Sequence, residues 1–163
     1  LVKCALSDIT GESRLHVNSH NGTHSLFAIG DQRYWEGYAA TVAVRTVDTV
    51  ALDSYCEAQG VAAIDILKMD IQGGELRALK GAKKLLERNA VSLIALEVLF
   101  HSLYQSQPMF WEIAEYLRSF GYGFHGLFEC HYHSRNSNVL SWADAIFLAP
   151  RFLEVPEWGK SER

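Results

Sequence analysis

The chain has 163 residues, of which 48% are hydrophobic and 21% are charged, as in an ordinary soluble globular domain with a sizeable core. Its formal net charge of −4 argues against a dedicated nucleic-acid surface, which is normally basic. No apolar run has the length of a membrane span, and the first residues do not form a signal-peptide pattern. We therefore expect neither nucleic acid nor membrane among its partners.

The three cysteines, Cys4, Cys56 and Cys130, are far apart and odd in number. They form no CxxC pair and do not have metal-ligand spacing. Isolated thiols of this kind are typical of proteins in a reducing compartment, where disulfides are rare. The sequence therefore predicts a cytoplasmic location.

The first residues are typical of a buried strand. Residues 1–6 are mostly apolar, and no helix, cap or polar lead-in comes before them. Ser7 and Asp8 follow in a turn. Because a natural domain rarely starts inside its own core, we expect this chain to be the carboxyl-terminal part of a longer domain.

Strand-like and helix-like segments alternate along the rest of the chain. The strand-like segments are β-branched or almost continuously apolar, whereas the helix-like ones carry an apolar stripe of helical period. The expected strands are 1–6, 14–17, 39–47, 64–70, 91–100, 122–128 and 145–148, and the expected helices are 50–59, 74–89 and 109–120. We expect one domain over 1–150 and a polar tail over 151–163.

The stretch 64–75, IDILKMDIQGGE, joins a buried strand to the start of a helix through a glycine turn. Asp70 stands where the strand should end, and Glu75 should lie in the first helical turn, where the helix dipole favours a carboxylate. In an open parallel sheet, ligands bind outside the carboxyl ends of the strands. Asp70 is therefore a candidate catalytic residue. The alternative is that Asp70 simply caps the helix.

Glu97 interrupts the second apolar strand, VSLIALEVLF. A carboxylate in a buried strand is costly unless it is paired, hydrogen-bonded or near the strand end. Glu97 is therefore a second candidate, the alternative being a structural carboxylate satisfied by its neighbours. His101, just beyond this strand, is an alternative base, and an ordinary loop histidine is the competing interpretation.

Two groups of histidines have spacings that are compatible with metal ligands. His16, His20 and His24 recur every four residues, and His131 and His133 would point the same way on a strand. Asparagine and glycine between the first three disfavour the helix that would align them. Solvated loop histidines are the favoured interpretation of both groups, so no metal site is predicted.

Strands that alternate with helices predict an α/β fold with a mostly parallel sheet and right-handed crossovers. The last two strands are joined by a loop that contains no helix, so one of them should run antiparallel. A parallel sheet that ends in an antiparallel hairpin is the layout of the Rossmann-like methyltransferases.

The runs ALDSYCEAQG, IDILKMDIQGGELRALKGA, LIALEVLF and LRSFGYGFHGLF, with ALSDITGE near the start, resemble the FkbM family of S-adenosylmethionine-dependent methyltransferases. The resemblance covers roughly residues 1–150, and LKMDIQGGELRALKGA is its most specific part. It implies methyl transfer to the hydroxyl of a sugar or natural product. The glycine-rich loop that holds the methionine part of the cofactor in this family is missing from the chain.

The resemblance also assigns roles to residues. Ser7 and Asp8 match the region that contacts adenine, and Asp70 is a cofactor and acceptor contact. The catalytic candidates are Asp70, Glu97 and His101, with Asp70 as base or orienting group and Glu97 as the second carboxylate. The expected partners are a small-molecule or glycan acceptor and a second copy in a homodimer. The alternative function is a non-catalytic module that binds a ligand or a protein.

Overall fold

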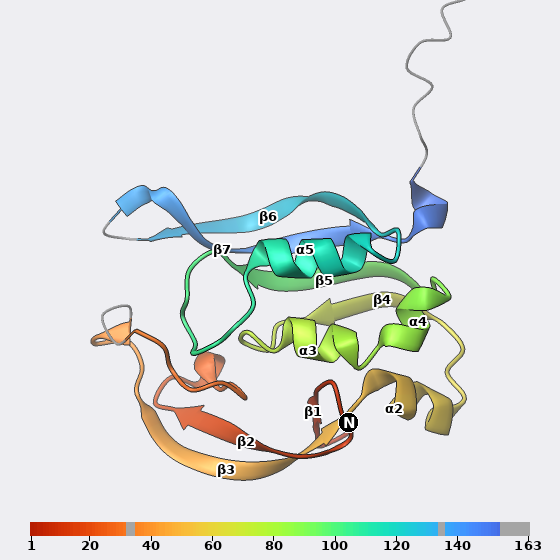
Figure 1. Ribbon diagram of the computed structural model, residues 1–163. Helices are drawn as coiled ribbons and strands as arrows, with labels where there is room; N and C mark the ends of the chain where they lie inside the picture. The colour runs from red at the N-terminus through yellow and green to blue at the C-terminus, as the bar shows by residue number, and fades with distance from the viewer. Residues whose placement is uncertain (32–34, 134–135, 154–163) are drawn as a thin grey trace, which may run out of the picture.

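The computed structural model describes residues 1–31, 35–133 and 136–153 (Figure 1). The strands are β1 (Ala5–Leu6), β2 (Gly11–Asn18), β3 (Thr41–Val50), β4 (Ile64–Met69), β5 (Val91–Leu99), β6 (Gly123–His133) and β7 (Asn136–Leu148). The helices are α2 (Leu52–Gln59), α3 (Glu75–Lys80), α4 (Lys83–Glu87) and α5 (Phe110–Arg118), with short 3₁₀ turns at Asn21–Thr23 and Pro150–Phe152. Most of the tail expected over 151–163 lies outside the described residues.

The prediction of one mostly parallel Rossmann-like sheet is wrong. Within the described residues the strands form two sheets, ordered β1-β3-β2 and β4-β5-β7-β6. Only β1–β3 and β4–β5 among the described pairs are parallel, whereas β2–β3, β5–β7 and β6–β7 are antiparallel. The alternation of strands and helices did not indicate that β3 would pair with β2 in a separate sheet, nor that β7 would lie next to β5.

The expected antiparallel hairpin at the end of the chain is present, and its strands are longer than predicted. β6 and β7 pair over most of their length, and β7 also pairs with β5, from Leu93 opposite Leu148 to Leu99 opposite Trp142. Only Ala5–Leu6 of the strand expected over 1–6 forms β1. A long hairpin strand therefore sits in the sheet beside the β5 strand that carries Glu97.

The core lies between the second sheet and helices α3, α4 and α5 (Figure 1). Alternate residues of β5 point into it, so that Ile94, Leu96 and Val98 are fully buried. The residues between them, including Glu97, are only half-buried. On β4, Leu67 and Met69 are buried, while Ile66 is 66% exposed. In the described residues the helices therefore cover one face of these strands, although their almost continuously apolar sequences indicated buried strands.

The helix expected over 74–89 is broken into α3 and α4 at Gly81. A Cβ atom on Gly81 would stand 2.1 Å from the carbonyl oxygen of Ser7, so only glycine allows β1 and α3 to approach this closely. The Gly81 carbonyl also accepts a hydrogen bond from the Asp53 N–H at 2.8 Å. These contacts come from distant parts of the chain, and the helical period of 74–89 did not reveal them.

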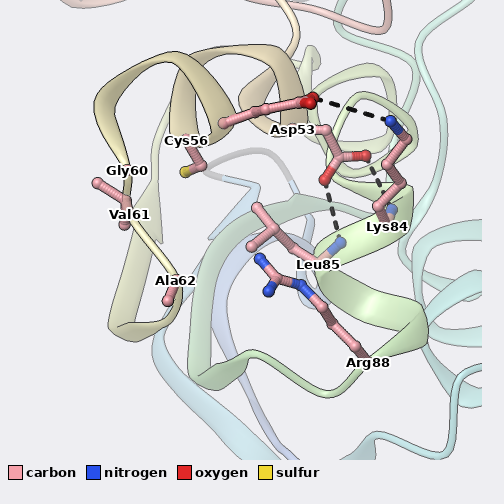
Figure 2. A pocket seen from close by; sticks show the side chains of 9 residues that line it. Asp53, Cys56, Gly60, Val61, Ala62, Lys84, Leu85 and Arg88 are labelled. Carbon is pink, nitrogen blue, oxygen red and sulfur yellow. Dashed lines mark hydrogen bonds and ion pairs between the residues drawn. The ribbon is translucent and has the colours of Figure 1, made fainter.

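Asp53 stabilises the start of α4, the helix that follows this break. Figure 2 shows its carboxylate directed at the first turn of α4, where it accepts hydrogen bonds from the N–H groups of Lys84 at 2.8 Å and Leu85 at 3.0 Å. A carboxylate at this position satisfies donors that an isolated helix leaves unpaired. Asp53, from α2, thus acts as the N-terminal cap of α4.

Replacing the Asp53 cap should destabilise the fold. We expect Asp53→Ala to lower the free energy of unfolding by about 1 kcal/mol, measured by urea denaturation, because two N–H groups of α4 lose their acceptor. The control is Glu57→Ala, which removes an exposed ion pair to Lys84 with a 3.9 Å separation and should change stability by less than about 0.5 kcal/mol. Equal effects of the two variants would contradict the capping role.

Candidate functional site

Two carboxylates meet where the parallel strands β4 and β5 end. Asp70 directly follows β4, and Glu97 lies three residues from the start of the loop after β5. The strands are neighbours in register, with Met69 opposite Leu96. The strands expected over 64–70 and 91–100 are therefore neighbours in the sheet. Asp70 is exposed, whereas Glu97 is half-buried on the face of the sheet opposite the helices.

Gln72 joins the two carboxylates. Its side-chain Nε2 donates a hydrogen bond to Asp70 Oδ1 and another to Glu97 Oε2, both at 2.8 Å. Because one nitrogen serves both, the two acceptor oxygens lie no more than twice that distance apart. Gln72 is not among the site residues that the sequence predicted. The available signal was a polar side chain inside the glycine turn, two residues after the candidate acid.

Tyr104 and Ser25 hold Gln72 from the other side. The Tyr104 hydroxyl donates to Gln72 Oε1 at 2.7 Å, and the Ser25 hydroxyl donates to the Gln72 carbonyl oxygen at 2.7 Å. Tyr104 is fully buried, and its ring packs against Trp35 with centroids 5.3 Å apart. Ser25 lies 47 residues from Gln72 and Tyr104 lies 32 residues from it, so the local sequence did not indicate these partners.

Glu75 begins α3, as predicted, but it is only 1% exposed. Its carboxylate accepts a hydrogen bond from the Ile71 N–H at 2.9 Å, which closes the turn after β4. Burial raises the pKa of Glu75 to about 7, and backbone hydrogen bonds, chiefly from Ile71, oppose that rise. A buried carboxyl thus supports the turn that carries Asp70 and Gln72.

Glu97 is the carboxyl with the larger perturbation. Burial raises its pKa to about 8, and the charges of Asp70, Glu75 and Asp144 add to that rise. Lys68 opposes it, but its ammonium group is engaged with Asp144 at 2.8 Å. A carboxyl whose pKa lies near neutrality is suited to exchange a proton with a bound group.

Burial also raises the pKa of Tyr104 well above that of an ordinary tyrosine, and the negative charge of Glu97 adds to the effect. The Tyr104 hydroxyl therefore keeps its proton and remains a hydrogen-bond donor. Its backbone is fixed as well, because the Tyr104 N–H donates to Gln107 Oε1 at 2.6 Å. Gln107 in turn donates to the His101 carbonyl oxygen at 2.7 Å, so the loop that follows β5 is tied together. The role of His101 as a base stays a prediction.

Ser7 and Asp8 are not placed with these carboxylates. The Ser7 side chain is buried and donates to Asp8 Oδ1 at 2.9 Å. Asp8 lies 3.8 Å from Arg77 Nε on α3. Both side chains thus have partners within the protein, and their role as cofactor contacts stays a prediction. Of the three predicted cofactor contacts, Asp8 and Asp70 are exposed and Ser7 is buried.

The structure describes the side chains of both histidine groups except that of His133. Among the described residues, no group of three or more histidine, cysteine, aspartate or glutamate side chains is arranged to hold a metal ion. His24 Nδ1 accepts a hydrogen bond from the Asn18 N–H at 3.1 Å, and His131 stacks on Trp142. Nothing is described of the His133 side chain.

The geometry can be compared with known proteins. The family model described as "Methyltransferase FkbM domain" matches residues 1–124, about three quarters of the chain. The chain belongs to the FkbM methyltransferase family. The matched region contains β4, the glycine turn, β5 and the loop with Tyr104, whereas β7 lies beyond it. No curated protein and no solved structure matches the chain.

None of the helices in the described residues is long and apolar enough to cross a membrane.

The raised pKa values predict how stability depends on pH. The pKa values of Glu75 and Glu97 are about 7 and about 8 in the folded chain, against an ordinary value of 4.5. The folded state therefore binds more protons than the unfolded state between these limits, and the free energy of unfolding should fall as pH rises from about 4.5 to about 8. Each group contributes at most about 1.4 kcal/mol per pH unit.

The measurement is urea denaturation at pH values from 5 to 9. Above about pH 7 Glu97 should account for most of the difference, so Glu97→Gln should flatten the slope between pH 7 and 8. Glu115→Gln, on the exposed side of α5, is the matched control and should keep the original slope. A Glu97→Gln curve parallel to that of the unaltered chain would contradict the assignment.

Proposed function

We propose that this chain takes part in S-adenosylmethionine-dependent methyl transfer, with a hydroxyl of a sugar or natural product as the acceptor. Family membership supports methyl transfer in general. The observation that carries the acceptor chemistry is the half-buried Glu97 carboxyl, held beside Asp70 at the carboxyl edge of two parallel strands. S-adenosylmethionine supplies a methyl group on a sulfonium when it is bound.

The chain's own residues supply a base and an orienting group for the acceptor. A hydroxyl must lose its proton as it is methylated, and a positioned base accelerates such a step about 10²- to 10⁴-fold. Glu97 is the proposed base, because its pKa of about 8 is closer to neutrality than that of an ordinary carboxyl. Asp70, which is exposed, is the proposed hydrogen-bond acceptor that orients the hydroxyl.

A hollow of about 700 Å³ is large enough for a small acceptor. It is lined by His16, Ala28, Ile29, Trp35, Glu36, Gly37, Ala39, Ala40 and Thr41. Asp70, Gln72 and Glu97 do not line it, and its link to them is indirect: the Trp35 ring packs on Tyr104, which donates to Gln72. A mostly apolar lining with a few polar groups is typical of sites for small organic ligands.

Substituting the proposed base should impair transfer. We expect Glu97→Gln to lower kcat by about 10²- to 10⁴-fold, measured as labelled methyl transferred to a panel of glycosides and phenolic natural products. For the unaltered chain, kcat should rise with pH around a midpoint near 8, because Glu97 must be ionised to accept a proton. Glu115→Gln is the control. A variant that keeps full kcat and the same pH profile would remove Glu97 from the mechanism.

Cofactor binding is tested separately by calorimetry. We expect S-adenosylmethionine to bind the chain. We expect Asp70→Ala to weaken this binding about tenfold, because one charge-assisted hydrogen bond is lost. Asp65→Ala, an exposed acid on the same β4 strand, is the matched control and should bind like the unaltered chain. Absence of binding by the well-folded chain would argue against this function for the chain by itself.

The second candidate function is a non-catalytic module that binds a ligand or a protein. The observation that favours it is the engagement of the Ser7 hydroxyl with Asp8 and of the Asp8 carboxylate with Arg77. It predicts a folded chain that binds a glycoside in the calorimeter without binding S-adenosylmethionine. Methyl transfer by the chain would exclude it.

The cytoplasmic location and the homodimer also remain proposals. Cys4, Cys56 and Cys130 are all free thiols, which suits a reducing compartment. In the described sheet β4 pairs with β5 alone and so forms an edge, and an edge strand is able to pair with a second copy. Light scattering after size-exclusion chromatography tests the dimer, and a monomer at tens of micromolar would contradict it.

A further inference from the structure

Gln72 is the residue through which the two carboxylates contact each other. We propose that Gln72 is a positioning residue, which holds Asp70 and Glu97 at one separation and stabilises the ionised form of Glu97, and that the Tyr104 hydroxyl fixes the orientation of its amide. The relevance of this arrangement to catalysis rests on the proposed function. The arrangement itself rests on four hydrogen bonds and the backbone conformation of one turn.

The orientation of the Gln72 amide follows from its partners. Tyr104 presents a hydroxyl donor at 2.7 Å from Oε1 and also lies 3.3 Å from the Thr23 carbonyl oxygen. With Oε1 facing this donor, both hydrogens of Nε2 are directed at Asp70 and Glu97. When both carboxyls are ionised, a reversed amide would bring Oε1 against two carboxylate oxygens and would lose both hydrogen bonds. The network therefore selects one amide orientation.

The backbone also aims Gln72 at the carboxylates. Its φ of 56° is in the left-handed region, which non-glycine residues rarely adopt, and Gly73 follows with a φ of 91°. The Ser25 hydroxyl holds the Gln72 carbonyl oxygen at 2.7 Å, and Glu75 closes the same turn from the helix side. A rare conformation supported from two directions keeps the side chain in one place.

The charges around Glu97 make a donor from Gln72 important. Lys68 and Asp70 face Glu97 from the β4 side, Glu75 from α3, Asp144 from β7 and Tyr104 from the loop after β5. Three of these are acids, and the one cation is engaged with Asp144. The Gln72 amide is thus a neutral donor that stabilises a negative charge on Glu97 amid other negative charges. It accepts no proton itself, so either carboxyl is able to ionise while the contact persists.

The test is a ¹³C NMR titration of the Glu97 carboxyl carbon in the isotope-labelled chain. Gln72→Met keeps the length of the side chain and removes its hydrogen bonds. We expect this variant to raise the pKa of Glu97 by about one unit, because the ionised carboxylate loses a donor. At a pH below the pKa this corresponds to an about tenfold smaller ionised fraction of Glu97 and an equal loss in kcat.

Two further variants separate the parts of the network. Tyr104→Phe keeps the ring that packs on Trp35 and removes the hydroxyl, so the pKa of Glu97 should rise by less than in Gln72→Met. Gln105→Met makes the same chemical change on an exposed glutamine that contacts the Ile29 carbonyl oxygen, and it should leave the titration of Glu97 unchanged. An unchanged Glu97 titration in folded Gln72→Met would overturn the proposal.

A measurement on the unaltered chain keeps the proposal testable if a variant does not fold. The ¹⁵N and ¹H resonances of the Gln72 side-chain amide should titrate with the same midpoint as Glu97, because both hydrogens contact the carboxyls. Amide resonances that do not respond to this titration would overturn it. A shifted Glu97 pKa in Gln72→Met, combined with no methyl transfer to any acceptor, would support the positioning role and overturn the proposed function alone.

Discussion

The turn between β4 and α3 is the constraint on which the site depends. It reverses the chain through two consecutive residues with positive φ, Gln72 and Gly73, and its polar backbone needs partners away from water. The buried Glu75 carboxylate supplies one to the Ile71 N–H, and Ser25 supplies another to the Gln72 carbonyl. Because a buried carboxyl is costly when charged, its pKa rises, and the turn is held by a group that is close to its own titration point.

The acidic residues around this turn affect the pKa of Glu97 on the neighbouring strand β5. Glu97 lies on the uncovered face of β5 yet is half-buried, and its neighbours Asp70, Glu75 and Asp144 are all acids. Burial and the charges of these neighbours all raise the pKa of Glu97, so this carboxyl keeps its proton to a higher pH than an ordinary glutamate. The structure thus separates an exposed carboxyl, Asp70, from a shielded one, Glu97, although both are acidic residues at the end of parallel strands.

The sequence by itself determined the local elements and the family. The near-continuous apolar runs at 64–70 and 91–100 predicted two strands, and the glycine turn with Glu75 predicted the start of α3. The run LKMDIQGGELRALKGA was the most specific part of the resemblance to the family, because a motif within one continuous segment is visible in the sequence. Asp70 and Glu97 were also identified from local sequence, because an acidic residue in or directly after an apolar strand stands out from its neighbours in the sequence.

Only the tertiary structure decided how these elements are assembled. The division into two sheets depends on β3 pairing with β2 and on β7 lying beside β5, which are contacts over long sequence separations. The break between α3 and α4 depends on Ser7 and Asp53, and the hydrogen bonds of Gln72 depend on Ser25 and Tyr104. Periodicity describes one segment at a time, whereas hydrogen-bond partners and the burial of a charged group are properties of segments that meet in space.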